Sequence, residues 1–206
     1  MKKLLTVNLA MAFVIGTSGI CLAGPYFTGK LAAVEGHDAD WSDSTGNIAE
    51  LSTDPGYGLS LAIGHDLYDY RLEAELAYRS NDLDEITAAG FPPVSIDGDV
   101  NSMALMGNFF VDFNYGAAVT PFVGAGIGVA NVEYELDSIT GIPLNVSDDD
   151  TVFAYQAALG VAFSISETAK IDLSYRYFAT ADPEFDGNNE IEYATSNIMA
   201  GFRVNF

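Results

Sequence analysis

From residue 24 onward, bulky apolar side chains recur at every second position, and small or charged residues occupy the positions between them. Residues 70–80 show the pattern most clearly: Tyr70, Leu72, Ala74, Leu76 and Tyr78 alternate with Arg71, Glu73, Glu75, Ala77 and Arg79. Successive side chains of a β-strand point to opposite faces, so this period of two predicts strands with one apolar and one polar or small face. The chain is therefore expected to be all-β, with helix as a minor component at most.

The alternation predicts eight strands, near residues 25–34, 57–65, 70–80, 99–113, 119–136, 151–164, 169–181 and 192–206. Long connections at 38–54, 81–98, 137–150 and 182–191 alternate with short turns at 66–69, 114–118 and 166–168. In an up-and-down arrangement, the long connections then share one end and the short turns the other. Transmembrane barrels with long outer loops and short periplasmic turns have this layout. The predicted fold is an eight-stranded antiparallel up-and-down transmembrane β-barrel.

The sizes of the alternating residues indicate which face points inward. One face carries mainly small residues, among them Gly58, Ser60, Ala62, Gly124, Gly126, Gly128, Ala158, Gly160 and Ala162. An eight-stranded barrel encloses only enough space for side chains, so these residues suit its lumen and the large residues suit lipid. The outward aromatic residues also fall into two levels, near the short turns and near the long loops, as in a membrane barrel.

Residues 1–23 have the three parts of a secretory signal peptide: Lys2 and Lys3, an apolar stretch, and small residues ending at Ala23. The expected organisation is a signal peptide at 1–23 and an outer-membrane β-barrel domain at 24–206. Acylation of Cys21 as a lipoprotein is a weaker alternative, because Ile20 is bulky where a small residue is expected. The single cysteine excludes a disulfide framework within the chain.

Strong negative charge argues against polyanionic partners. The chain has 8 Lys and Arg against 29 Asp and Glu, a formal charge of -21, which argues against binding nucleic acid. Most acids fall in the expected long loops, which predicts acidic extracellular loops. Asp148, Asp149 and Asp150 could gather a hard divalent cation through carboxylate oxygens, although a solvated acidic surface explains them better. No cofactor is expected.

Charged residues on the inward face should pair with one another, because an unpaired charge in the lumen would be costly. The predicted lumen ion-pair network comprises Lys30, Arg71, Glu73, Glu75, Arg79, Asp112, Asp172, Arg176 and Arg203. We interpret it as a plug. The alternative is the selectivity filter of a narrow porin that passes small solutes.

The residues do not predict an enzyme. His37 and His65, the two histidines, fall at opposite ends of the expected barrel and cannot share a site. Glu73 and Glu75 are flanked by Arg71 and Arg79, so ion pairing accounts for them better than acid–base catalysis. We therefore assign no catalytic residue.

Three segments resemble the small bacterial outer-membrane β-barrel family, which includes opacity-type surface antigens and OmpA-like porin-family barrels. They are the glycine-rich strand 121–130, the strand 173–177, and the closing strand 201–206, which ends in Phe206. The resemblance covers essentially all of residues 24–206. It implies a bacterial outer-membrane location and a surface antigen or adhesin-like role.

The same resemblance implies that the protein contacts outer-membrane lipid and lipopolysaccharide. Phe206 would form part of the signal that the barrel assembly machinery reads. We expect a monomer that meets an extracellular ligand through its loops. A secreted lipocalin-like carrier of an apolar ligand is a further alternative, since soluble eight-stranded barrels hold such ligands inside.

Overall fold

The computed structural model describes residues 24–37, 39–43, 46–88, 94–113, 116–139, 142–181, 184–185, 189–191 and 193–206. The expected signal peptide, residues 1–23, lies outside the described residues and stays a prediction. Within the described part, no helix is long and apolar enough to cross a membrane.

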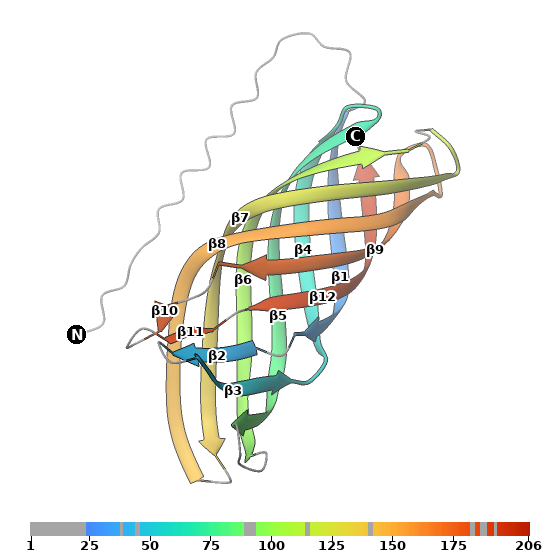
Figure 1. Cartoon of the computed structure of the whole chain (residues 1–206). Coiled ribbons are helices and arrows are strands. Elements are labelled where there is room, and N and C mark those ends of the chain that lie inside the picture. The colour runs from blue at the N-terminus through green and yellow to red at the C-terminus, as the bar shows by residue number, and fades with distance from the viewer. Residues whose placement is uncertain are drawn as a thin grey trace, which may run out of the picture.

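Eight strands close into a barrel (Figure 1), which confirms the predicted fold. They are β1 (Pro25–Gly36), β4 (Gly56–Asp66), β5 (Tyr70–Ala88), β6 (Val94–Asp112), β7 (Val119–Ile139), β8 (Ile142–Ser164), β9 (Ala169–Thr180) and β12 (Ala194–Asn205). Each pairs antiparallel with the next barrel strand along the chain, and β1 pairs with β12 to complete the cylinder. Closure leaves the barrel without a free edge in its membrane part.

The predicted long loops are wrong in their extent. β5 pairs with β6, and β7 with β8, far beyond the expected strand ends, so most of 81–98 and 137–150 is strand. The regions 38–54 and 182–191 contain four further strands: β2 (Ala39–Asp43), β3 (Gly46–Thr53), β10 (Glu184–Phe185) and β11 (Asn189–Ile191). These join β5 in the order β10-β11-β2-β3-β5 and lie together at one end of the barrel (Figure 1).

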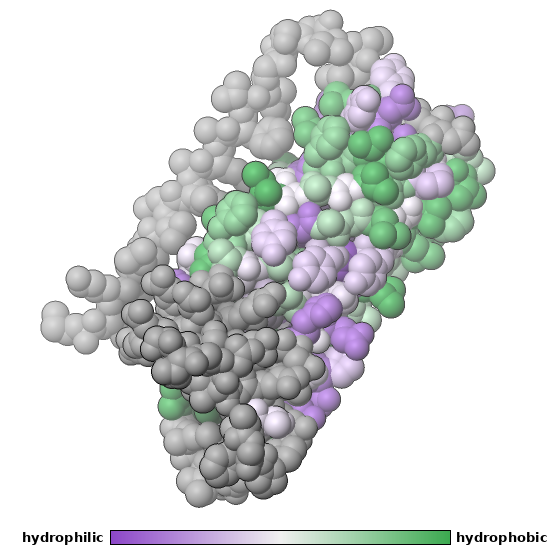
Figure 2. All heavy atoms as spheres, in the orientation of Figure 1, coloured by the Kyte–Doolittle hydropathy of each residue, from purple (hydrophilic) through white to green (hydrophobic). Residues whose placement is uncertain are grey.

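The predicted orientation of the barrel wall is confirmed. Leu72 and Leu76 on β5 are 51% and 49% exposed, whereas Arg71 and Glu75 are 2% and 0% exposed. Figure 2 shows apolar side chains gathered over a broad zone of the wall. This apolar outer surface fits lipid and is unsuited to water.

The polarity of the strands inverts in their outer extension, beyond the apolar belt. There the inward face becomes apolar and buried, including Leu83, Ile96, Val100 and Val132. The outward positions become acidic, as at Asp82 and Asp99. The reason is the change of surroundings: the same outward face meets hydrocarbon below this level and water above it. Acidic residues that suggested loops therefore lie on strands.

Candidate functional site

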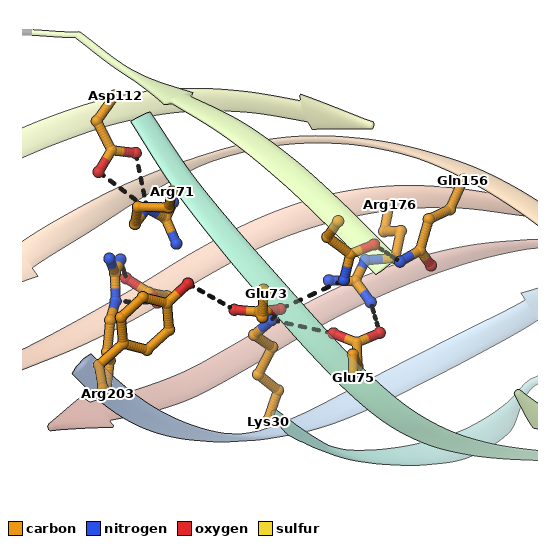
Figure 3. Close-up of polar contacts among 11 residues, drawn as sticks. Lys30, Arg71, Glu73, Glu75, Asp112, Gln156, Arg176 and Arg203 are labelled. Atoms are coloured by element: carbon orange, nitrogen blue, oxygen red, sulfur yellow. Dashed lines mark hydrogen bonds and ion pairs between the residues drawn. The ribbon is translucent and has the colours of Figure 1, made fainter. Parts of the chain in front are cut away.

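A cluster of four charged side chains crosses the middle of the lumen (Figure 3). Lys30 on β1 places Nζ 2.9 Å from Glu73 Oε1 and 3.1 Å from Glu75 Oε2, both on β5. Arg176 on β9 donates from Nη1 to Glu75 Oε1. The Tyr26 hydroxyl also donates to Glu73 Oε2, at 3.2 Å. All four charged residues are buried, so the ion pairs form away from solvent.

Neutral polar groups extend this cluster to the opposite wall. Gln156 on β8 donates from Nε2 to Asn108 Oδ1 at 2.6 Å, and Asn108 on β6 donates to Glu73 Oε1 at 3.4 Å. The contacts tie together side chains from β1, β5, β6, β8 and β9. Such a network braces the barrel across its bore.

Two separate ion pairs lie nearer the short turns. Arg71 donates from Nε to both carboxylate oxygens of Asp112, at 3.0 and 2.9 Å. Arg203 on β12 contacts Asp172 on β9 through Nη2 and Nε, at 2.6 and 3.1 Å. Paired contacts of a guanidinium with a carboxylate fix direction as well as distance.

Arg79 is the member of the predicted set that the structure sets apart. Among the described residues it has no carboxylate within ion-pair distance. Its Nε donates to Asn197 Oδ1 at 3.2 Å, and its guanidinium carbon lies 3.8 Å from the centre of the Phe178 ring. The nine predicted residues thus form one four-residue cluster, two pairs and one arginine held by an amide and an aromatic face.

Buried aromatic residues also lie on the inward face of the barrel, which the sequence analysis did not anticipate. The Arg71 guanidinium carbon lies 4.5 Å from the Phe110 ring centre and 4.9 Å from that of Phe122, a cation–π arrangement on two sides. Each of the three large inward rings has a glycine as its direct partner on the neighbouring strand. The pairs are Tyr26 with Gly64, Phe110 with Gly124, and Phe122 with Gly160.

The glycine partners explain how rings fit in so narrow a bore. A Cβ at Gly124 would overlap the Phe110 ring, and one at Gly64 would overlap the Tyr26 ring. The alternation in the sequence already indicated that these aromatic residues point inward. That each ring lies opposite a glycine became clear only with the register between neighbouring strands.

Carboxylates line the outward face of the extended strands. Direct cross-strand partners are Asp82 with Asp99, Asp99 with Glu135, and Glu133 with Asp149. Like charges at directly opposed positions destabilise a sheet. Partial burial and the neighbouring Asp82 carboxylate raise the pKa of Asp99 above its ordinary value.

The three consecutive aspartates at 148–150 lie on β8, where neighbouring residues point to opposite faces. Asp148 Oδ1 accepts from the Asp149 backbone N–H at 3.0 Å, and Asp150 Oδ1 accepts from that of Thr151 at 2.7 Å. No group of three metal-ligating side chains occurs among the described residues. Cation binding by these three aspartates stays a prediction.

The two histidines lie at opposite ends of the barrel wall, as expected, but His37 has a partner that sequence reasoning missed. His37, just after β1, places Nε2 2.9 Å from Ser196 Oγ on β12. Ser196 Oγ also lies 2.7 Å from the Tyr175 hydroxyl on β9. The pairing of β1 with β12 brings these side chains together. The sequence alone did not indicate this contact, because His37 and Ser196 are 159 residues apart along the chain.

Phe206 follows β12 and is 76% exposed. Its backbone N–H donates to the carbonyl of Pro25, the first residue of β1, at 3.0 Å. Its side chain is therefore presented on the surface at the short-turn end. Recognition by assembly machinery stays a prediction.

Similarity to known proteins is clear at the level of family. The model of the outer membrane protein beta-barrel domain family matches residues 6–206. The protein named Outer membrane protein PagN, from Salmonella typhimurium strain LT2, is 31% identical over 134 residues, which are 59% of this chain. The matched region is 56% of that relative, so the chain spans about half the length of the curated relative it matches.

Two solved structures show the same fold. Neisserial surface protein A has a TM-score of 0.58 and 20% identity, covering 92% of this chain and 100% of that one. Ail, the attachment invasion locus protein of Yersinia pestis, solved with the heparin analogue sucrose octasulfate, has a TM-score of 0.50 and 17% identity. That likeness covers 87% of this chain and 99% of Ail.

Proposed function

The chain belongs to the outer membrane protein β-barrel family, and from this premise we propose that it is a plugged barrel whose acidic outer extension mediates surface interactions. Family membership locates it in the bacterial outer membrane, so the alternative of a secreted lipocalin-like carrier is wrong. One observation supports the proposal: large and charged side chains are buried inside the barrel, whereas carboxylates cover the outward face of the strand extension.

The plug rests on the side chains that span the bore. Lys30, Glu73, Glu75 and Arg176 are buried across its middle, and Phe110 and Phe122 fill the level nearer the short turns. Opening a path for ions would require these ion pairs to separate in a confined, poorly solvated space.

Planar-bilayer recording tests the plug. We expect the reconstituted protein to show no large, steady single-channel conductance. A variant that shortens the aromatic level, Phe110→Ala with Phe122→Ala, should pass more current, whereas Leu72→Ala on the outer wall should not. Steady conductance of the unaltered barrel would contradict the plug and favour the narrow porin.

The outer extension favours a partner with basic segments. Its outward face presents Asp82, Asp99, Glu133 and Glu135 together, within a chain of net charge -21. Ail was solved with a sulfated, anionic heparin analogue, and this acidic surface would repel such a ligand. We therefore propose a surface-interaction role in which the partner is a basic protein segment.

Binding to a basic peptide, such as polylysine, tests this role on the detergent-folded protein. We expect salt-sensitive binding that weakens severalfold when Asp82, Asp99, Glu133 and Glu135 are changed to their amides. Neutralising Asp69 and Glu167, exposed acids by the short turns, provides the charge control. Stronger binding to heparin than to the basic peptide would contradict the proposal.

The remaining interactions follow from the same orientation. The apolar wall contacts membrane lipid, and the acidic face lies at the level where divalent cations could bridge to lipopolysaccharide phosphates. We keep Asp148, Asp149 and Asp150 as the candidate ligands for such a cation. Calorimetric titration with calcium or magnesium tests them, and absence of heat would contradict cation binding.

We further propose that the protein is a monomer and that the assembly machinery recognises the β12 strand with Phe206.

A further inference from the structure

A serine, a histidine and a tyrosine meet on the outer wall of the barrel, outside the lumen. Ser196 Oγ lies 2.9 Å from His37 Nε2 and 2.7 Å from the Tyr175 hydroxyl. The His37 ring also packs edge-on against Tyr177, with 5.6 Å between ring centroids. His37 directly follows β1, Ser196 lies near the start of β12, and Tyr175 lies in the middle of β9; β12 is hydrogen-bonded to both β1 and β9.

This group sits at the boundary between the apolar belt and the polar extension. Ile198, two residues beyond Ser196 on the same face, is 70% exposed in the manner of a lipid-facing side chain. Glu35, the direct cross-strand partner of Ser196, is the first charged residue on the outward face of β1. Tyrosines such as Tyr175 and Tyr177 favour the interface between membrane and water. Acyl ester linkages of outer-leaflet lipids lie in the same region.

We propose that Ser196 and His37 form a hydrolytic site for acyl esters of lipids in the outer leaflet. An activated nucleophile requires a serine hydroxyl within hydrogen-bond distance of a histidine nitrogen. In the tautomer of His37 that leaves Nε2 unprotonated, Ser196 Oγ donates to it. The Tyr175 hydroxyl lies 2.7 Å from the attacking oxygen, and either group can be the donor of that hydrogen bond. When the ester binds, the Tyr175 hydroxyl would turn to donate to the developing oxyanion. Because the substrate arrives by diffusion in the membrane plane, a cavity in the barrel is unnecessary.

The reaction is balanced as ester hydrolysis with water. Ser196 Oγ attacks the ester carbonyl carbon while His37 Nε2 takes the hydroxyl proton. The tetrahedral intermediate then expels the alcohol, which receives that proton from His37 and leaves an acyl group on Ser196. Water then gives a proton to His37 Nε2 and attacks the acyl carbon. The second tetrahedral intermediate breaks its bond to Ser196 Oγ and releases the carboxylic acid, while His37 returns the proton to Ser196 Oγ.

Glu35, which lies directly across the strand pair from Ser196, would add a negative charge near the proposed site. Side chains at directly opposed strand positions lie within reach of one another. A negative charge beside Ser196 and His37 would stabilise the imidazolium that forms when His37 takes the proton.

The proposed hydrolytic site depends on the membrane orientation of the barrel and is independent of the proposed binding by the acidic extension.

Covalent labelling with a long-chain fluorophosphonate tests the nucleophile directly. On the folded protein in mixed micelles we expect a single adduct, located at Ser196 by mass spectrometry and absent from Ser196→Ala. His37→Gln should slow labelling by roughly a hundredfold to ten-thousandfold, the usual contribution of a general base. Ser164→Ala, which removes another exposed serine from the barrel, is the matched control.

Turnover is measured as fatty acid released from phospholipid or lipid A in vesicles. Tyr175→Phe should lower that rate by roughly a hundredfold or more, as loss of one oxyanion donor does, while the serine still reacts with the probe. Heat-modifiable migration of each variant confirms folding. Equal labelling of Ser196→Ala and the unaltered protein, or labelling without any fatty acid release, would overturn the proposal.

Discussion

Glu75 is the carboxylate that holds two cations at the centre of the lumen, Lys30 and Arg176. Changing it to glutamine removes the carboxylate that pairs with Arg176 and leaves Lys30 with Glu73 alone, so two buried cations share one counter-charge. We expect Glu75→Gln to lower the free energy of unfolding by about 3–5 kcal/mol, the typical cost of breaking a buried ion pair. Urea unfolding in detergent micelles measures the loss.

The same chemical change at an exposed position provides its control. Glu167 lies in the turn between β8 and β9 and is exposed. Glu167→Gln should stay within about 0.5 kcal/mol of the unaltered protein. Equal stabilities of the two variants would show that the central ion pairs do not hold the barrel together.

Gly124 and Gly107 form a second matched pair at the residue scale. A Cβ at Gly124 would overlap the Phe110 ring inside the lumen, whereas one at Gly107, on the outer wall, would have its nearest neighbour at 3.8 Å. Gly124→Ala should therefore cost about 1–3 kcal/mol of unfolding free energy, as overpacking does. Gly107→Ala should cost nothing measurable in the same urea series, and the reverse order would refute the packing described.

At the scale of the strand, the extension of β5, β6 and β7 carries an electrostatic penalty. Asp99 faces Asp82 on one side and Glu135 on the other. Relieving these contacts with Asp99→Asn should stabilise the extension by roughly 0.2–1 kcal/mol. Amide hydrogen exchange along the extended strands reports the local change. Faster exchange in the variant would contradict it.

The raised pKa of Asp99 gives the same strands a dependence on pH. The folded state takes up this proton at a higher pH than the unfolded state does, so stability falls as pH rises through the folded pKa. The penalty is present at neutral pH and is relieved as pH drops from that raised pKa to the ordinary value. Exchange protection of the extension should increase over this interval in the unaltered protein, and less in Asp99→Asn.

The strand scale also shows where sequence patterns were sufficient and where they were not. Alternation predicted the membrane part of β5 because one face meets lipid and the other a packed lumen. Beyond the belt, Asp82 and Asp99 still alternate with Leu83 and Val100, but in inverted polarity. Acidic residues are common in loops, so these segments were predicted as loops. The sequence analysis therefore missed the strand extensions and the additional short strands.

Across the whole molecule, closure of the chain determines which residues of the interior meet. The alternation of side chains along each strand was enough to predict that Lys30, Glu73 and Arg176 point inward. Which of them contact one another depends on the register between strands that are far apart in sequence. The same holds for His37 and Ser196, 159 residues apart. Fold, orientation and membrane location could be predicted from the sequence. The separation of Arg79 from the ion pairs, and the rings opposite glycines, could not.

Thiol accessibility in lipid bilayers tests the closed lumen and the outward apolar wall together. In a background with Cys21 replaced by serine, Ser60→Cys places a near-isosteric thiol in the lumen, where Ser60 is 1% exposed. Leu72→Cys places one on the wall and Ser164→Cys one beyond it. A charged methanethiosulfonate should label Ser164→Cys alone, and all three after denaturation. Rapid labelling of Ser60→Cys or Leu72→Cys in the folded protein would show water where this account has packed side chains or lipid.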